Sequence, residues 1–439
     1  MAENGCDKDE EEKRSFEELM RLASPPMEIS SINKTSLEAL TKLNLPSCGI
    51  SSLPSNLHAY IPNLSILFCP NNHFKELPPV IGLCPKLQMV SFKSNGMLSI
   101  HPDALKPQLR WLILTDNSLT TIPSEIGRLP LLQKLMLSGN QLKEIPVEIS
   151  SCRNLELTRL ASNKLTSPPM SLLELPNLAW VGLSANPFLS EITAKQEEEG
   201  LFSSLPVLND PILESEDDGN VLGSGASGII RKVLFNDQEV AVKTYVGQMT
   251  SDGSPDQERL LSLAASTVKS PFLIQLIGQT PHKKSLVMEL LENFQALAGP
   301  PSMESCSRDV YPNDYSLTAE DGMHLVSGLL QVMMQLHARG IMHGDFYGHN
   351  ILISDCAKKV KLSDFGAGFF YDPKEKYGAC LEQIEVRAFG ILVGEVIALV
   401  QRDVGRKGSV ESLTKLLSTC RSSSTFSSIL ASWNSKSDG

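Results

Sequence analysis

Apolar residues recur in a fixed frame through residues 40–188 of this chain. The frame is LxxLxLxxNxL, with other apolar residues replacing some leucines, and successive copies start 22 to 24 residues apart. The copies begin at Leu40, Leu64, Leu87, Leu109, Leu132, Leu155 and Leu178. One copy is too short to bury its own apolar edge, so neighbouring copies must stack. The pattern therefore predicts an array of seven repeats, each with one short strand.

The ninth position of the frame is polar in most copies. It is Cys48 in the first copy and asparagine in the others, namely Asn72, Asn95, Asn117, Asn140, Asn163 and Asn186. An asparagine amide can satisfy backbone groups that a buried turn leaves unpaired. The period and the frame are those of the leucine-rich repeat, and the chain resembles that family over residues 37–190. The resemblance implies an α/β solenoid.

Residues between the consensus leucines of a strand should face the concave side of such a solenoid, because successive side chains point to opposite faces. These residues are Ile66, Phe68, Met89, Ser91, Trp111, Ile113, Lys134, Met136, Leu157, Arg159, Trp180 and Gly182. Exposed apolar clusters often mark interaction sites. We interpret Trp111, Met136, Leu157, Arg159 and Trp180 as a site for a protein partner. The alternative is that this face packs against the second half of the chain or against another copy.

A glycine-rich segment joins two predicted strands early in the second half. It comprises Gly223, Ser224, Gly225, Ala226, Ser227 and Gly228. Apolar runs at 229–235 and 239–242 flank a turn at 236–237, so strands and not a helix follow the glycines. A dinucleotide-binding loop is followed by a helix, so the strand predicted here excludes that type of loop. Glycine allows backbone N–H groups to approach phosphates, and Lys243, at the end of the next strand, lies within reach of them.

Three polar side chains further along are spaced for ATP chemistry. Asp345 and Asn350 lie five residues apart, and Asp364 follows 19 residues after Asp345. The apolar runs 351–353 and 360–362 predict a hairpin that returns Asp364 to the side of Asp345. Phosphoryl transfer requires a group that orients the nucleophile and metal ions that absorb negative charge. The spacing therefore predicts one shared cleft.

These motifs, in this order, resemble the protein-kinase family over residues 211–433, which implies a two-lobed α+β protein-kinase-like fold that uses ATP and Mg²⁺. By this resemblance Lys243 pairs with Glu258 beside the phosphates, and Asp345 is the catalytic base. The resemblance makes Asn350 and Asp364 the Mg²⁺ ligands. It also implies an ATP-binding set formed by the glycine-rich segment with Ile230, Ala241, Lys243, Met288 and Glu289.

Several positions depart from the protein-kinase pattern. Gly344 stands where most members carry an arginine that binds activation-loop phosphate, and Tyr347 stands where Ser/Thr kinases carry lysine. We expect the next helix to begin at Glu385, after a short activation segment over 366–384 that contains no Ser or Thr. The His-Gly-Asp form also occurs in small-molecule phosphotransferases, which keeps that class open. We interpret the chain as a protein kinase of Ser/Thr or dual specificity, with a nucleotide-binding pseudokinase or scaffold as the alternative.

Composition limits the remaining possibilities. The formal net charge is −11, and no dense Lys/Arg run suited to nucleic acid or a membrane surface occurs. Acidic residues concentrate in a predicted N-terminal tail and cap over 1–36 and in a predicted solvated linker over 191–210. The nine cysteines form neither a disulfide framework nor a metal pair, and the chain start lacks a secretion signal. The apolar run 388–400 is too short to span a bilayer. We therefore expect a cytoplasmic protein without a membrane span, and the sequence indicates no oligomeric state.

Overall fold

The structure of the protein is a computed structural model with two compact units, Met1–Asn177 and Leu178–Gly439, which are described separately. The described residues are 17, 21, 34–198, 205–209, 213, 220–247, 249–282, 285–354, 357–401, 408–423 and 425–434. Most of the predicted tail and cap over 1–36 lies outside them, as do residues 199–204 and 210 of the predicted linker.

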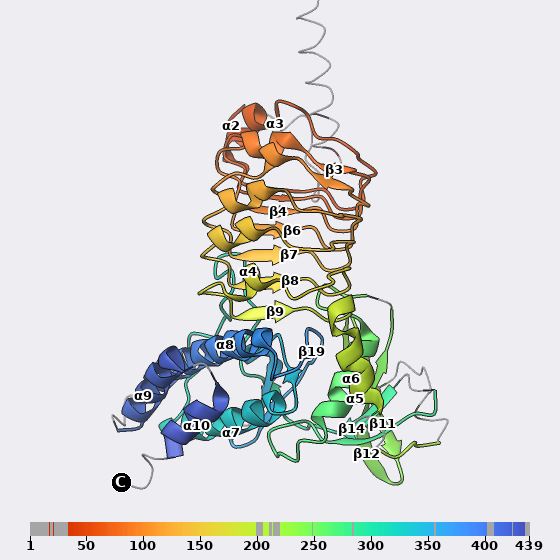
Figure 1. Ribbon diagram of the computed structural model, residues 1–439, viewed down its shortest axis with the longest axis vertical. Coiled ribbons are helices and arrows are strands. Elements are labelled where there is room, and N and C mark those ends of the chain that lie inside the picture. Colours follow the sequence, from red (N-terminus) through yellow and green to blue (C-terminus); the bar gives the residue numbers. More distant parts are fainter. Residues whose placement is uncertain are drawn as a thin grey trace, which may run out of the picture. The chain divides into compact units, whose positions relative to one another are not determined.

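Six strands of the predicted array form a parallel sheet in the first unit, in chain order (Figure 1). They are β1 (Lys42–Asn44), β2 (Ile66–Phe68), β4 (Met89–Ser91), β6 (Trp111–Ile113), β7 (Lys134–Met136) and β8 (Leu157–Arg159). The register is constant, from Lys42 opposite Ile66 to Lys134 opposite Leu157, and the central side chain of each strand is buried. A smaller parallel pair joins β3 (Glu76–Leu77) and β5 (Ser99–Ile100). The predicted repeat array is thus confirmed over this unit.

Short helical turns connect these strands. They are α2 (Lys34–Ala39), α3 (Leu57–Tyr60), η2 (Pro79–Leu83), η3 (Pro102–Ala104), η4 (Ser124–Arg128), η5 (Val147–Ser151) and α4 (Met170–Leu173). Proline precedes or opens several of them, which suits proline because the first N–H groups of a helix have no partner within it.

The repeat asparagines form a buried ladder of hydrogen bonds. Asn140 accepts from the N–H of Leu119 at 3.0 Å and donates to the carbonyls of Leu114 and Leu137 at 3.0 and 2.9 Å. Two of the bonded groups belong to the preceding repeat, and the two carbonyls also accept from the amides of Asn117 and Asn163, so neighbouring repeats share them. The same arrangement recurs at Asn72, Asn95, Asn117 and Asn163. The role predicted for the asparagines is confirmed.

The second unit begins with the strand of the seventh repeat, β9 (Trp180–Gly182), followed by η6 (Pro187–Leu189) and α5 (Ser190–Glu198). Packing therefore divides the chain 13 residues before the predicted boundary at 190. Helix α5 occupies the start of the predicted linker. Later in the linker, the N–H of Leu208 donates to the carbonyl of Gln279 at 2.9 Å, and that of Gln279 to Pro206 at 3.0 Å. Where it is described, the linker is thus not simply a solvated chain.

The first lobe of this unit is an antiparallel sheet in the order β10-β11-β12-β14-β13. Its strands are β10 (Val221–Gly225), β11 (Gly228–Phe235), β12 (Gln238–Tyr245), β13 (Leu276–Gln279) and β14 (Ser285–Glu289). Asn236 and Asp237 have φ of 50° and 59°, which is the left-handed geometry of a tight two-residue hairpin turn. Helix α6 (Pro255–Ala265) packs against β12 and is capped by Ser254, whose hydroxyl accepts from the N–H of Gln257 at 3.2 Å.

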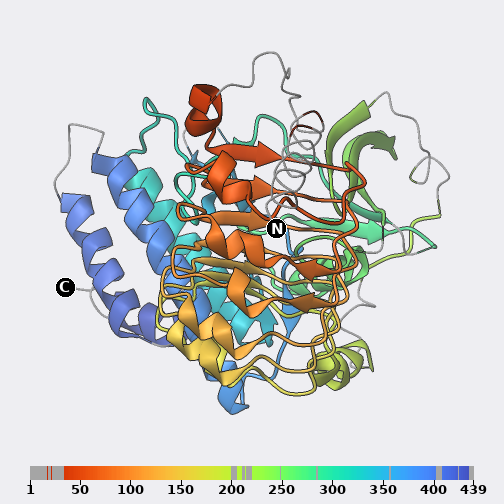
Figure 2. The same cartoon turned by 90° about the horizontal axis from the view of Figure 1, so that it is seen from above.

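The second lobe is mainly helical. Its helices are α7 (Ala319–His337), α8 (Lys376–Gln401), α9 (Gly408–Ser422) and α10 (Phe426–Asn434), with α8 and α9 side by side (Figure 2). Its short strands are β15 (Gln295–Ala296), β16 (Ile341–Met342), β17 (Ile351–Ile353), β18 (Val360–Leu362) and β19 (Phe369–Phe370), and η9 (Gly348–Asn350) precedes β17. The predicted hairpin over 351–353 and 360–362 is confirmed.

Helix α8 starts earlier than predicted. We expected the helix to begin at Glu385, but it begins at Lys376, so the segment after Asp364-Phe365-Gly366 is shorter than the predicted 366–384. The first turns of α8 are stabilised by tertiary packing that the local sequence does not reveal, with Tyr377, Leu381 and Ile384 all buried. No helix among the described residues combines the length and the apolar character that crossing a membrane requires.

The asparagine ladder generates a prediction about stability. Asn140→Ala should lower the free energy of unfolding by about 1–3 kcal/mol, because it leaves the buried N–H of Leu119 without its side-chain partner. Asn154→Ala is the matched control, since its amide makes an exposed bond to the carbonyl of Pro130, and it should cost less than about 1 kcal/mol. Urea unfolding, with hydrogen exchange of β6 and β7 as a local readout, measures both. Equal effects of the two substitutions would contradict this role of the ladder.

Candidate active site

The glycine-rich segment forms one wall of a polar cavity of about 440 Å³. All six residues from Gly223 to Gly228 line it, in the hairpin between β10 and β11. A Cβ added at Gly223 or Gly225 would meet no atom within 4 Å, so the backbone there faces open space. At Gly228 a Cβ would lie 2.3 Å from the carbonyl oxygen of Thr244. The neighbouring strand is therefore too close for any residue other than glycine at this position. The loop therefore leaves room for a phosphate group beside its N–H groups.

A buried ion pair lies in the same cavity. Lys243 on β12 pairs through Nζ with Oε1 of Glu258 on α6, as the sequence predicted. Their side chains are 15% and 2% exposed. Burial raises the pKa of Glu258, and the charge of Asp364 adds to this rise, whereas Lys243 lowers the pKa. The lysine ammonium is thus held at a fixed place between the two lobes.

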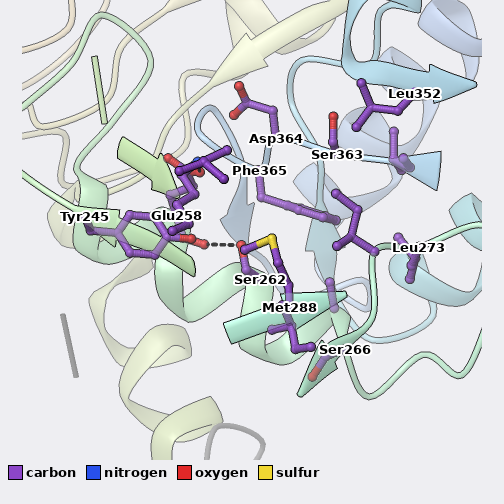
Figure 3. Close-up of a pocket in the computed structure, with 16 residues that line it drawn as sticks. Tyr245, Glu258, Ser262, Ser266, Leu273, Met288, Leu352, Ser363, Asp364 and Phe365 are labelled. Atoms are coloured by element: carbon purple, nitrogen blue, oxygen red, sulfur yellow. Dashed lines mark hydrogen bonds and ion pairs between the residues drawn. The ribbon is translucent and has the colours of Figure 1, made fainter. Parts of the chain in front are cut away.

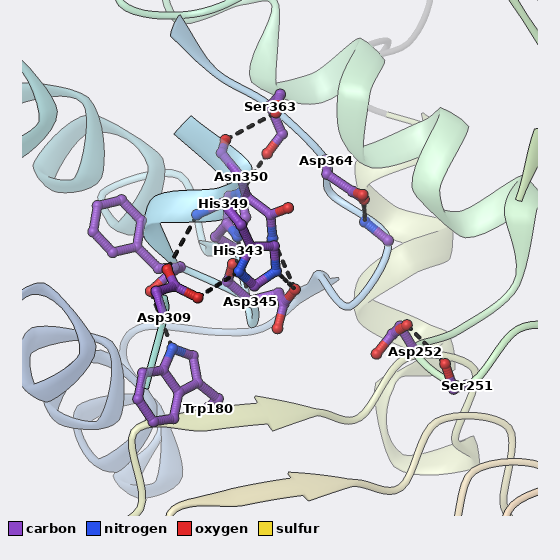
Figure 4. A network of polar contacts seen from close by, with 12 residues as sticks. Trp180, Ser251, Asp252, Asp309, His343, Asp345, His349, Asn350, Ser363 and Asp364 are labelled. Carbon is purple, nitrogen blue, oxygen red and sulfur yellow. Dashed lines mark hydrogen bonds and ion pairs between the residues drawn. The ribbon is translucent and has the colours of Figure 1, made fainter. Parts of the chain in front are cut away.

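Asp345, Asn350 and Asp364 are brought together by the β17–β18 hairpin (Figure 4). The N–H of Ser363 donates to the carbonyl of Asn350 at 2.9 Å, which fixes the return of the chain. The amide nitrogen of Asn350 donates to Oδ2 and to the carbonyl of Asp345, at 2.8 and 2.9 Å. Asp345 and Asp364 both line the 440 Å³ cavity. The predicted shared cleft is thus present for Asp345 and Asp364, whereas Asn350 does not line it and lies beside it through its bond to Asp345.

Asp364 has φ of 56°, a conformation that is uncommon for residues other than glycine. Aspartate tolerates it because its short side chain can bond the local backbone, and here Oδ1 accepts from the N–H of Gly366 at 3.0 Å. Strained backbone of this kind often accompanies functional sites. The conformation directs the carboxylate of Asp364 into the cavity that Lys243 and Asp345 also line.

A second, mainly apolar cavity of about 270 Å³ adjoins the first (Figure 3). Ile230, Met288 and Lys243 line it, as expected for a nucleotide-base site. Ala241 lines neither cavity, since it is buried in the core with Met288. Glu289 also lies outside both, because its carboxylate binds Nζ of Lys361 at 2.5 Å. The structure therefore brings most of the predicted ATP-binding set together, but not Ala241 and Glu289.

The polar cavity fits a magnesium-bound nucleotide. Asn350 Oδ1 accepts no hydrogen bond from the described residues, and Asp364 supplies carboxylate oxygen, the ligand type that Mg²⁺ prefers. Within the part of the chain that the structure describes, no group of three His, Cys, Asp or Glu residues is placed to hold a metal alone. Mg²⁺ typically uses one or two carboxylates together with substrate phosphates. The donor set and the open glycine loop suit that mode of binding.

Residues 343–350 form the loop that carries Asp345, and we call it the catalytic loop after the role predicted for Asp345. A buried carboxylate connects this loop to helix α8. Glu385 accepts from the N–H groups of His343 and Gly344 at 3.1 and 2.7 Å, and contacts Nε2 of His337 at 2.6 Å. Burial raises the pKa of Glu385, but the hydrogen bond and charge of His337, together with His343 and the N–H of Gly344, hold the pKa below its usual value. The stabilisation is therefore lost as the pH falls through the lowered pKa. His343 itself is buried and contacts the carbonyl of Ser363 at 2.9 Å through Nε2.

Asp309 is a site residue that the sequence did not reveal. Its Oδ1 contacts Nδ1 of His349 at 2.7 Å, and its Oδ2 accepts from the N–H of His349 at 3.1 Å. Nε2 of His349 lies 3.9 Å from Oδ2 of Asp345. Burial lowers the pKa of His349, but Asp309 and Asp345 outweigh it, so that the pKa is raised. Asp309 lies in an irregular loop without a motif, and nothing in its local sequence signals this contact.

The predicted partner site on the repeats needs correction. Trp180 is 1% exposed, and its indole N–H donates to the carbonyl of Phe346 at 3.0 Å while its ring stacks on Tyr347. Trp180 is therefore not available to a partner. Trp111, Leu157 and Arg159 are also buried, and the Trp111 ring is covered by Nζ of Lys134 at 4.4 Å. Of the five predicted residues, Met136 alone is half-exposed.

Comparisons with known proteins agree with this division. The family model "Leucine rich repeat" matches residues 85–142, and "Protein kinase domain" matches residues 217–388. The chain is similar to the human phosphorylase b kinase gamma catalytic chain, liver/testis isoform, with 26% identity over 168 residues, or 36% of this chain and 39% of that one. It is also similar to a G-type lectin S-receptor-like serine/threonine-protein kinase of Arabidopsis thaliana, with 26% identity over 230 residues, or 46% and 26% of the two chains.

The chain spans only 39% and 26% of the lengths of these two relatives. Among solved structures, a leucine-rich-repeat protein of Leptospira interrogans matches with 28% identity and a TM-score of 0.32, over 35% of this chain and 40% of that one. The repeat sheet, the two-lobed unit with its ion pair and paired aspartates, and the two family matches together lead to one conclusion. The chain carries a leucine-rich-repeat region followed by a protein kinase domain.

Proposed function

We propose that the protein is an ATP-dependent protein kinase that transfers the γ-phosphate of ATP to a hydroxyl group of a protein. One observation carries the proposal: the glycine loop, the Lys243–Glu258 pair, Asp345 and Asp364 all line one cavity. Phosphoryl transfer depends on positioning and electrostatic stabilisation, and these residue types supply both. Several similar curated proteins are named serine/threonine kinases, which supports a serine or threonine acceptor.

In this proposal each residue has a defined task. Bound Mg-ATP supplies the transferable phosphoryl group and the metal charge that neutralises it. Lys243, fixed by Glu258, binds phosphate oxygens, and Asp364 with Oδ1 of Asn350 provides the oxygen ligands for metal. Asp345 orients the acceptor hydroxyl and takes its proton. The amide of Asn350 holds the carboxylate of Asp345 in place for that task.

The enzyme proposal predicts a pattern of loss among variants. Lys243→Ala and Asp364→Asn should abolish measurable transfer, while Asp345→Asn should lower kcat about 10²- to 10⁴-fold and retain nucleotide binding. Asp372→Asn is a control, since its carboxylate accepts from the N–H of Lys374 outside both cavities. Mg-ATP turnover and calorimetric binding of Mg-ADP measure the two properties. Wild-type turnover no greater than that of Asp364→Asn would end the enzyme proposal.

The alternative is a nucleotide-binding pseudokinase or scaffold. Two observations favour it: the segment between Gly366 and α8 is short, and the lysine position of Ser/Thr kinases is occupied by the buried Tyr347. This alternative predicts binding of Mg-ADP without turnover. The same pair of measurements therefore separates the two functions.

The proposed enzyme should not depend on phosphorylation of its activation segment. Gly344 replaces the phosphate-binding arginine, and the two tyrosines of the segment as predicted, Tyr371 and Tyr377, are both buried. The hydroxyl of Tyr371 contacts Nδ1 of His337 at 2.7 Å, so a phosphate there would have to displace packed atoms. Phosphatase treatment should leave kcat within about twofold of the untreated value. A tenfold fall that rephosphorylation at either tyrosine restores would contradict the prediction.

We further propose that the repeats recruit a protein partner, and that the protein acts in the cytoplasm. Leucine-rich repeats stack into extended surfaces that proteins use for binding. Half-exposed side chains remain on the strand face opposite the consensus leucines, namely Ile66, Phe68, Ile113, Lys134 and Met136. The seven described cysteines are free thiols, which is consistent with a reducing compartment.

Recruitment can be tested on the half-exposed residues. Phe68→Ala with Met136→Ala should weaken partner capture about 30-fold, since loss of interface anchors typically costs about 2 kcal/mol. Leu131→Ala is a control, because Leu131 is 48% exposed but does not lie on a repeat strand. Co-purification from cell extract, with a melting curve for each variant, provides the comparison. Equal capture by both variants would place the partner site elsewhere.

A further inference from the structure

The seventh repeat strand, β9, contacts the catalytic loop directly through Trp180. The indole N–H of Trp180 donates to the carbonyl of Phe346, the residue after Asp345, at 3.0 Å. The indole ring lies flat on the ring of Tyr347, with 4.1 Å between centroids and an interplanar angle of 6°. Buried tryptophan usually finds a partner for its N–H, and offset stacking adds to the energy of burial. The contact thus fixes both the backbone and a side chain of the loop.

The stack continues from Trp180 to the neighbourhood of Asp345. Tyr347 stacks on His349 at 5.0 Å, and His349 is held by Asp309 and lies 3.9 Å from the carboxylate of Asp345. On the other end, the guanidinium of Arg308 lies 5.5 Å from the Trp180 ring centroid. A continuous set of packed side chains therefore joins β9 to the residue that orients the acceptor hydroxyl in the proposed reaction.

The backbone of β9 is fixed to the same region at two more points. Gly344 has φ of 76°, and a Cβ there would lie 2.5 Å from the carbonyl oxygen of Ala367 and 2.8 Å from that of Val181. Nη1 of Arg387 on α8 donates to the carbonyl of Leu178 at 2.5 Å. The left-handed φ and the close carbonyls of Ala367 and of Val181 in β9 together disfavour any side chain at position 344. The two departures from the protein-kinase pattern, Gly344 and Tyr347, are thus among the loop residues that lie against β9.

We propose that Trp180 is a positioning residue for phosphoryl transfer, through which the last repeat strand holds the catalytic loop and thereby Asp345 in its working geometry. This proposal rests on the protein-kinase function proposed above. Trp180 touches no reacting atom and acts through Phe346 and Tyr347. The strand supplies, as a permanent part of the fold, the order that an arginine bound to activation-loop phosphate supplies in other members of the family.

The test compares full-length variants at the stack. Trp180→Ala should lower kcat about tenfold, equivalent to about 1.4 kcal/mol of activation free energy, with KM for ATP and the affinity for Mg-ADP unchanged within about twofold. Trp180→Phe keeps an aromatic ring for stacking but loses the N–H donor, so kcat should fall on the order of threefold. Tyr347→Ala added to Trp180→Ala should lower kcat little further, since both act through one contact. Trp433→Phe, on helix α10, is the control and should match wild type.

Hydrogen exchange of the amides from 344 to 350 is measured on the same proteins. It should rise about tenfold in Trp180→Ala and stay at the wild-type rate in Trp433→Phe. This readout decides the positioning role even if wild-type turnover proves absent, so failure of the kinase proposal and failure of this one are distinguishable. Trp180→Phe carries the test if the alanine variant unfolds. Unchanged exchange and kcat in Trp180→Phe, or a raised kcat in either variant, would overturn the proposal.

Discussion

The buried carboxylate of Glu385 is the constraint on which the geometry of the catalytic loop depends. A charge in the interior is tolerated only when it is paired and hydrogen-bonded. Glu385 meets that condition by accepting the N–H groups of His343 and Gly344 together with His337. Removal of any one partner leaves the charge undersatisfied, so the loop and helices α7 and α8 are held to one arrangement. The early start of α8 at Lys376 places two additional turns before Glu385 and embeds it within the helix.

Gly344 lies between the buried carboxylate of Glu385 and the strand of the last repeat. Its N–H binds Glu385, while its left-handed φ and the carbonyl oxygens of Ala367 and Val181 leave no space for a Cβ. A residue with a side chain at this position would have to displace backbone atoms. The absence of the phosphate-binding arginine is therefore explained by the left-handed backbone and by packing against Ala367 and Val181, and does not by itself indicate that phosphoryl transfer has been lost.

The sequence revealed those parts of the fold that local patterns encode. The repeat strands and the asparagine ladder could be predicted because the spacing of the leucines and the position of the asparagine are the same in nearly every repeat. Lys243, Glu258, Asp345, Asn350 and Asp364 were predicted because they sit in short motifs. The predicted start of α8 was wrong, because tertiary burial and not helix propensity determines its first turns. Contacts such as that between Trp180 and Phe346, 166 residues apart, leave no mark in either local sequence.

Strand β9 belongs to the repeats by its sequence and to the second compact unit by its packing. In sequence, Leu178 to Asn186 complete the seventh repeat, and a boundary at 190 assigns Trp180 to the repeat domain. In the structure, Trp180 of this strand gives its indole N–H and its ring to the catalytic loop, and the carbonyl of the nearby Leu178 accepts from Arg387 on α8. Terminal repeats normally need a polar cap on their open side. Here Trp180 is a large buried aromatic group that the catalytic loop contacts, so the strand of the last repeat packs in the same compact unit as that loop.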